Sequence, residues 1–225
     1  MTKVLLVAAE GLPYIKSGGL ADVIASLPVA LCKQNVGVSV VLPLYKKILD
    51  NHPELEKITD YDVKSGYINK TAGLYTSKLN DVTYYFIRQD DYFGRENMYG
   101  YNDDGERFAF YCKAVCDMLL YISFKPDVIH TNDWHTGMIP LLCKREYKDE
   151  QYRKYKHVYT IHNLLFQGNF SKSTLDCFND MNEYYENGDI KFDAARVFFE
   201  RTFGENDEYF FYARLKAEEM NNAVI

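Results

Sequence analysis

A short, uninterrupted apolar run at residues 4–8, repeated at residues 38–42, constrains the fold more than any other feature of this sequence. A run of this length with no polar alternation is typical of a strand that is buried on both of its faces. Between the two runs, apolar residues recur at helical spacing over residues 20–31, and Asn35 and Gly37 then end the pattern. The sequence therefore predicts a βαβ unit, in which a right-handed crossover usually joins two parallel strands.

The rest of the chain continues to alternate between helix and strand patterns. A helical pattern covers residues 106–122, a shorter one covers residues 136–144, and apolar strand runs occur at 128–130 and 157–161. Residues 57–88 instead contain short alternating stretches, which indicate a β-rich insertion or edge strands. Together these patterns predict an α/β fold with a Rossmann-like, doubly wound and mostly parallel sheet.

Charge and cysteine content exclude several classes of partner. The formal net charge is −6, and lysines and arginines are mixed with acidic residues, so we expect no basic face for nucleic acid or an anionic membrane. The five cysteines are scattered and lack the CxxC spacing of a zinc site, which favours reduced thiols in a cytoplasmic protein. The opening apolar run is too short for a signal peptide or a membrane span, and the oligomeric state stays open.

The segment KSGGLADV, residues 16–23, lies at the expected turn from the first strand into the first helix. Gly18 and Gly19 let the backbone approach a ligand closely, the free amides at a helix start attract an anion, and Lys16 adds positive charge. A phosphate group would fit here, although the two glycines alone are equally consistent with a tight turn. The segment matches neither the dinucleotide fingerprint GxGxxG nor a Walker A loop.

Two polar segments follow predicted buried strands, HTNDWH at residues 130–135 and TIHNLLFQG at residues 160–168. Ligands of open α/β sheets bind at the carboxyl ends of strands, so we expect Asp133, His162 and Asn163 to face one crevice. A neutral imidazole at His162 could hold a sugar hydroxyl or a developing positive charge. The alternative for Asp133 is a helix cap above a packed tryptophan.

A loop rich in glycine, aromatic and charged residues, 90–110, leads into the predicted long helix. Surface loops of this kind often carry binding residues, and Arg95, Tyr99 and Arg107 are its candidates, although most of its charges would be solvated. The histidines show neither HxH nor HExxH spacing, so no metal site is predicted, and the GxSxG elbow of a hydrolase is missing. His135, on an apolar shoulder, is more typical of packing than of catalysis.

Four segments, KSGGL, ERFAF, KPDVIHTNDWHTG and TIHNLLFQG, occur in an order that resembles the bacterial glycogen synthases and plant starch synthases. The resemblance runs from the first residue to about residue 170. It implies the GT-B fold, in which two Rossmann-like domains face each other across a cleft. Residues 1–225 would form the N-terminal domain, and the C-terminal domain, which binds most of the nucleotide sugar, would be absent.

The resemblance also implies a reaction. Glucose would pass from ADP-glucose to the non-reducing 4-hydroxyl of an α-1,4-glucan or malto-oligosaccharide, with retention of configuration. Neither a metal nor another cofactor would take part. The intact protein would then be an enzyme, a hexosyltransferase of glycogen or starch synthesis.

The family's site residues map onto positions that match its motifs. Asp133 and His162 would line the glucose position as the catalytic residues. Lys16 would face the phosphates with the two glycines of its loop. Together with the loop candidates, the expected substrate-binding residues are Lys16, Gly18, Gly19, Asp22, Asn163, Arg95 and Tyr99.

The match to the family fades after Gly168, in a part of the chain where a helix is expected over residues 207–221. A retaining transfer requires donor, acceptor and charge-stabilising groups to converge in a closed cleft, so we expect residues 1–225 alone to be inactive. The alternative is a non-catalytic glucan-binding or regulatory module, and a third is an unrelated nucleotide-sugar enzyme on the same fold. The choice between ADP-glucose and UDP-glucose as the donor stays open, because the residues that select the base would lie mainly in the other half.

Overall fold

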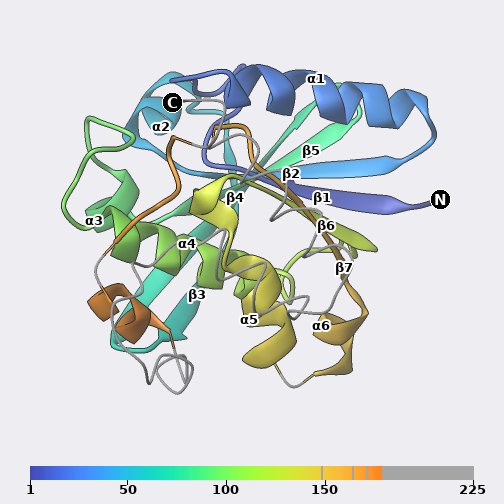
Figure 1. Ribbon diagram of the computed structural model, residues 1–225. Helices are drawn as coiled ribbons and strands as arrows, with labels where there is room; N and C mark the ends of the chain where they lie inside the picture. The colour runs from blue at the N-terminus through green and yellow to red at the C-terminus, as the bar shows by residue number, and fades with distance from the viewer. Residues whose placement is uncertain (148, 164, 171, 179–225) are drawn as a thin grey trace, which may run out of the picture.

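The computed structural model describes residues 1–147, 149–163, 165–170 and 172–178 (Figure 1). The helix expected over residues 207–221 lies outside these described residues. Among the helices that are described, none is both long enough and apolar enough to cross a membrane.

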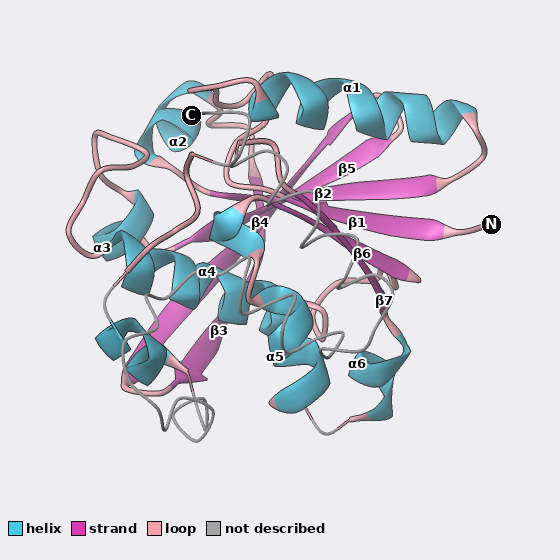
Figure 2. Ribbon diagram, in the orientation of Figure 1, coloured by secondary structure: helices cyan, strands magenta, loops and turns pink. Residues whose placement is uncertain are grey.

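A seven-stranded sheet carries helices on both of its faces (Figure 2). The strands are β1 (Lys3–Val7), β2 (Gly37–Pro43), β3 (Glu56–Ser65), β4 (Ile68–Leu79), β5 (Val82–Arg88), β6 (Val128–Asn132) and β7 (Lys156–Thr160). The helices are α1 (Leu20–Lys33), α2 (Lys46–Asn51), α3 (Asp90–Phe93), α4 (Asp104–Met118), α5 (Ile139–Arg145) and α6 (Glu150–Lys154). Short 3-10 turns occur at Trp134–Thr136 and Lys172–Cys177.

The strands follow the order β3-β4-β5-β2-β1-β6-β7 across the sheet. The five strands from β5 to β7 in this order are parallel, whereas β3 and β4 add an antiparallel edge. Helix α1 covers one face, and α4, α5 and α6 lie on the opposite face (Figure 2). The predicted doubly wound, mostly parallel sheet is therefore confirmed.

The βαβ unit at the start of the chain is also as predicted. β1 and β2 are parallel neighbours, and α1 connects them. Leu5, Leu6 and Val7 of β1 are fully buried, as the uninterrupted apolar run indicated. Gly11 is required where the chain leaves β1, because a Cβ atom there would lie 2.6 Å from Cγ2 of Ile24 in α1.

Several elements differ from the sequence-based expectation. β3 and β4 form the predicted edge, but β5 lies inside the sheet, parallel to β2, and Tyr85 and Phe86 on its two faces are both buried. The helices α2, α3 and α6 were not predicted, because four to six residues are too few to show a helical period. α5 begins at Ile139 rather than at residue 136, since the preceding turn is 3-10 in form.

Helix α4 is buried along most of its length and anchors the loop before it. Arg107 is fully buried, and its guanidinium donates to the Tyr92 carbonyl at 2.8 Å and pairs with Asp104. Removing one partner of such a buried pair typically costs about 3–5 kcal/mol. Asp104 also accepts a hydrogen bond from the Gly100 amide at 2.7 Å. Residues 94–103 are therefore held against the helix.

Tyr111 ties α4 to the central strands. Its hydroxyl oxygen lies 2.9 Å from the carbonyl oxygens of both Ala8 and Val41, and its side chain is fully buried. Because Ala8 directly follows β1, this contact helps to fix the carboxyl end of that strand.

Replacing Tyr111 by Phe should lower the free energy of unfolding by about 1–2 kcal/mol, because two buried carbonyl groups lose their shared donor. Tyr121→Phe is the matched control: this tyrosine is 46% exposed, and such a surface change is worth less than about 0.5 kcal/mol. Urea denaturation of the two variants measures the difference. An equal loss of stability in both would contradict the role assigned to Tyr111.

Candidate functional site

Polar side chains from three neighbouring strands meet at one edge of the sheet. β6 lies between β1 and β7, and all three are parallel, so their carboxyl ends open on the same side. The chain turns from one half of the sheet to the other between β1 and β6, which is where open α/β sheets bind ligands. We call the residues there the strand-end cluster: Glu10, the loop 16–19, Asn132, Asp133 and His162.

Asp133 fixes the start of the loop that follows β7. Its Oδ1 accepts a hydrogen bond from the His162 amide at 2.7 Å, and its own amide donates to the Thr160 carbonyl at 2.9 Å. Asp133 has φ 56° and ψ 177°, a conformation that is nearly restricted to glycine and costs on the order of 1–3 kcal/mol. The two hydrogen bonds help to hold this conformation, so the carboxylate stays beside His162.

Burial raises the pKa of the Asp133 carboxyl group, because only 9% of the residue is exposed to water. The hydrogen bond from the His162 amide acts in the opposite direction, and the negative charge of Glu10 adds to the rise in pKa. The charge of Glu10 thus acts on Asp133, although the two residues follow different strands.

Asn132 orients the imidazole of His162. The Asn132 amide nitrogen donates to the carbonyl oxygens of Val7 at 3.1 Å and His130 at 3.2 Å, so Oδ1 faces His162 Nε2, at 2.9 Å. Because Oδ1 can only accept, Nε2 must carry the proton, and Nδ1 is the acceptor of the neutral ring. The exposed His162 ring is thus prepared to accept a hydrogen bond from a ligand hydroxyl.

The loop between β1 and α1 keeps donors available for an anion. Lys16 Nζ lies 2.7 Å from both carboxylate oxygens of Asp22, in an ion pair that is about half exposed. Within the described chain, the amides of residues 19–21 donate to no acceptor, as is usual in the first turn of a helix. In the described chain, the Lys16 loop therefore leads into a helix whose first amides have no hydrogen-bond acceptor.

Glu10 is a candidate that the sequence patterns did not reveal. It follows β1, is only 4% exposed, and accepts hydrogen bonds from the amides of Ser17 and Gly18, the latter at 3.1 Å. An acidic residue just after a buried strand, facing a glycine-rich loop, was the available signal. It places a second carboxylate in the strand-end cluster besides that of Asp133.

Arg95 and Tyr99 of the loop before α4 have different surroundings. Arg95 forms two hydrogen bonds to the Asp103 carboxylate, at 2.7 and 2.6 Å, and donates to the Asp91 carbonyl at 2.6 Å. Tyr99 packs on His135, with 4.9 Å between ring centroids. Asn163 lies beside His162 in the chain, and its Oδ1 accepts from the Leu165 amide at 3.0 Å.

His135 belongs to an aromatic cluster, as the sequence indicates. Its ring stacks on Trp134 and packs on Phe108, with centroid distances of 4.0 and 4.7 Å. Burial lowers the pKa of His135 to about 3, and the positive charge of Arg107 acts in the same direction, so the ring is neutral at physiological pH. Gly168, at φ 69°, covers the cluster, because a Cβ there would lie 2.7 Å from the Trp134 ring.

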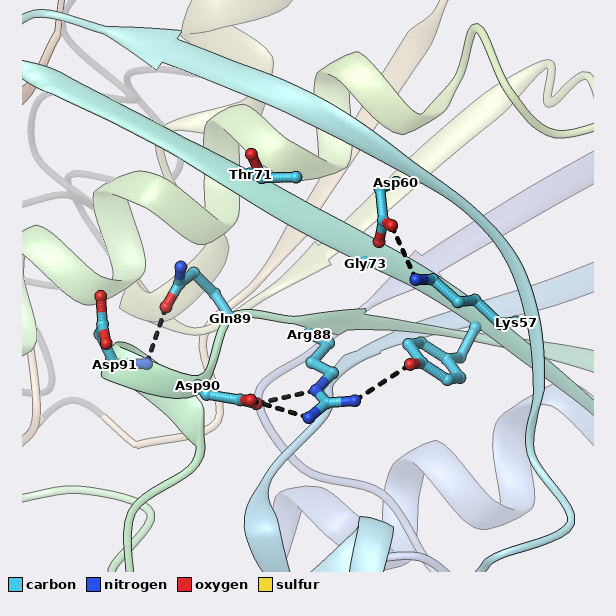
Figure 3. A pocket seen from close by; sticks show the side chains of 9 residues that line it. Lys57, Asp60, Thr71, Gly73, Arg88, Gln89, Asp90 and Asp91 are labelled. Carbon is cyan, nitrogen blue, oxygen red and sulfur yellow. Dashed lines mark hydrogen bonds and ion pairs between the residues drawn. The ribbon is translucent and has the colours of Figure 1, made fainter.

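In the described part of the chain, no three His, Cys, Asp or Glu side chains are grouped as a metal ion would require. A hollow of about 250 Å³ lies at the antiparallel edge of the sheet (Figure 3). Its charges are already paired, since Arg88 binds Asp90 and Tyr75, and Lys57 binds Asp60. None of the expected site residues lines it, so we assign it no role in the site.

Sequence comparison relates this chain to enzymes of glucan synthesis. Residues 3–203 match the family model of the starch synthase catalytic domain. A glycogen synthase of Clostridium kluyveri is 46% identical over 223 residues, which are 98% of this chain and 47% of that protein. A glycogen synthase of Caldicellulosiruptor bescii is 38% identical over 224 residues, 97% of this chain and 46% of that protein. The chain thus spans about half the length of these curated relatives.

A solved structure supports the same relation. The catalytic domain of starch synthase IV from Arabidopsis thaliana, bound to ADP and acarbose, aligns with a TM-score of 0.72 and 29% sequence identity. The alignment covers 81% of this chain and 38% of that chain.

Acid should destabilise the protein partly through His135. Its pKa is about 3 in the folded state against an ordinary 6.5, so the unfolded state binds the proton first as the pH falls below 6.5. The loss approaches about 1.4 kcal/mol per pH unit until the folded ring protonates. We expect His135→Leu to lose less unfolding free energy than wild type between about pH 6.5 and pH 4, in parallel urea titrations. The same dependence of unfolding free energy on pH in wild type and His135→Leu would contradict this assignment.

Proposed function

Because the chain belongs to the starch synthase catalytic-domain family, we propose that it forms one wall of the active site of a retaining glucosyltransferase of glycogen or starch synthesis. Its fold is the Rossmann-like N-terminal half of the GT-B glycosyltransferase architecture, as expected. The observation that carries the proposal is the junction of Asn132, Asp133 and His162 beside the Lys16 loop.

The proposed donor is ADP-glucose. The free amides of residues 19–21 and the positive end of α1, a helix of 14 residues, would attract its diphosphate. Gly18 and Gly19 would let the phosphates approach the backbone closely. Lys16 would turn from Asp22 to a phosphate oxygen, which costs little because a half-exposed ion pair is weak. That the related starch synthase IV is bound to ADP supports a nucleotide donor.

Asp133 and His162 would contact the glucose that is transferred. Positive charge develops at the anomeric carbon as the diphosphate leaves, and preorganised negative or dipolar groups lower the barrier. His162 Nδ1 would accept from a glucose hydroxyl while Asn132 holds Nε2. Asp133 would act both through its charge and by holding the His162 backbone. Asn163, the next residue, would add a polar contact to the same wall.

Arg95 and Tyr99 complete the proposed binding residues. Tyr99 lies against His135, which follows Asp133 by two residues in the chain. Arg95 would reach substrate only after its ion pair with Asp103 opens. The acceptor would be the non-reducing end of an α-1,4-glucan, and the proposed reaction needs neither a metal nor another cofactor.

His162→Ala should reduce turnover of the complete protein by at least about 100-fold, the usual effect of losing a positioned catalytic group. Its exposed ring makes few packing contacts, so the fold should survive, as a thermal melt would verify. His52→Ala is the control, because His52 pairs with Glu54 and not with the strand-end cluster. A rate of glucose transfer from ADP-glucose to glycogen near that of wild type would contradict a catalytic role for His162.

Residues 1–225 alone should transfer no glucose, whereas a longer chain that also contains the second domain of the cleft should. Half of a cleft can neither exclude water nor bring donor and acceptor together. The test is an assay of both proteins with ADP-glucose and glycogen, and turnover by residues 1–225 alone contradicts the proposal. Glucan binding combined with inactivity of the complete protein would favour a non-catalytic glucan-binding or regulatory module.

A further inference from the structure

The Glu10 carboxylate already occupies part of the anion-binding loop. Its Oε2 accepts hydrogen bonds from the amides of Ser17 and Gly18, and a Cβ atom on Gly18 would lie 3.4 Å from its Oε1. Consecutive amides that converge on one oxygen form the kind of nest that binds phosphate oxygens in other proteins. In this loop, a side chain of the protein fills the nest.

Two buried hydroxyl groups, those of Tyr45 and Tyr99, lie within reach of the charge of this carboxylate. Neither the Tyr45 nor the Tyr99 hydroxyl forms a hydrogen bond of good geometry to any described residue. Tyr99 lies beside Ser17 and faces Tyr45; burial raises the pKa of both hydroxyls, and the negative charge of Glu10 adds to the rise. A buried hydroxyl without a well-formed hydrogen bond is costly, so two such hydroxyls near a carboxylate call for an explanation.

We propose that Glu10 is an exchangeable anion in the donor site. Without donor, its carboxylate holds the amides of Ser17 and Gly18; when a nucleotide sugar binds, a phosphate oxygen takes these amides. The carboxylate then accepts hydrogen bonds from the hydroxyls of Tyr45 and Tyr99. This inference rests on the donor site proposed above and assigns it a positioning residue.

The exchange explains why both sets of donors are present. A carboxylate has room for about four hydrogen bonds, and the empty loop would otherwise leave its amides unpaired in a nearly buried place. Without donor, Glu10 keeps the loop folded. After a phosphate has displaced it from the loop amides, the tyrosine hydroxyls form hydrogen bonds to its carboxylate. The Lys16 side chain undergoes the matching change, from Asp22 to phosphate, so that charges stay paired in both states.

The proposal predicts that a weaker competitor improves binding. In Glu10→Gln, the side-chain oxygen still fits the amides but carries no charge, so ADP should bind about fivefold more tightly, the gap between a charged and a neutral hydrogen bond. Glu56→Gln is the matched control, because Glu56 is exposed at the start of β3. Calorimetric titration of the complete protein with ADP gives the dissociation constants. If Glu10 only braces the loop, the variant would bind ADP less tightly.

Tyr99→Phe tests the other half of the exchange. Without ligand, this variant loses only a hydroxyl that forms no hydrogen bond of good geometry within the described residues, so its stability and the hydrogen exchange of the Ser17 and Gly18 amides should stay close to wild type. Its affinity for ADP should fall about threefold or more, because the displaced carboxylate loses a donor. Unchanged ADP affinity in Tyr99→Phe would overturn the proposed exchange.

The wild-type titration separates this inference from the proposed function. ADP binding to wild type with an unchanged or weaker affinity in Glu10→Gln would overturn the exchange and leave the donor site in place. Failure of both wild type and Glu10→Gln to bind ADP would contradict the donor site and the exchange together. Binding by Glu10→Gln alone would support the exchange in its strongest form.

Discussion

The parallel ladder that joins β1, β6 and β7 is the constraint on which the whole site depends. Val7 lies opposite Thr131, and Thr131 lies opposite Tyr159, so the three strands end at nearly the same level. Backbone hydrogen bonds set this register, and a slip by one residue would turn each following side chain to the other face. Three segments that are distant in the sequence therefore deliver their polar residues to one place.

Most polar groups of the strand-end cluster are fixed by the backbone. Asp133 is bound to the amide of His162, Asn132 to the carbonyl of Val7, and Glu10 to the amides of its neighbouring loop. These hydrogen bonds hold the side chains in place before a ligand arrives, and the partner of Asn132 lies within the sheet itself. Such preorganisation is where most of the electrostatic contribution to catalysis originates, and the unusual backbone of Asp133 is part of its cost.

The elements that depend on a local pattern could be predicted from the sequence. The position of a strand within the sheet could not, because it depends on pairing with distant parts of the chain. Apolar runs identified β1 and β2, and the strand-end rule brought Asp133 and His162 together. The place of β5 inside the sheet depends on a partner strand that no local pattern reveals. The ion pair between Arg95 and Asp103 was likewise not evident from the composition of their loop. Glu10 was overlooked because only the folded loop shows what its carboxylate contacts.

Trp134, the single tryptophan of the 225-residue chain, stacks on His135 directly after Asp133. A protonated imidazole quenches indole emission, but burial lowers the pKa of His135 to about 3, so its ring is neutral at physiological pH. Gly168, which ends the loop after β7, lies against the same indole. Trp134 is thus an intrinsic fluorophore that contacts both of the loops that carry Asp133 and His162. Its emission can follow movements of these loops optically, with no label attached and over a wide range of buffers.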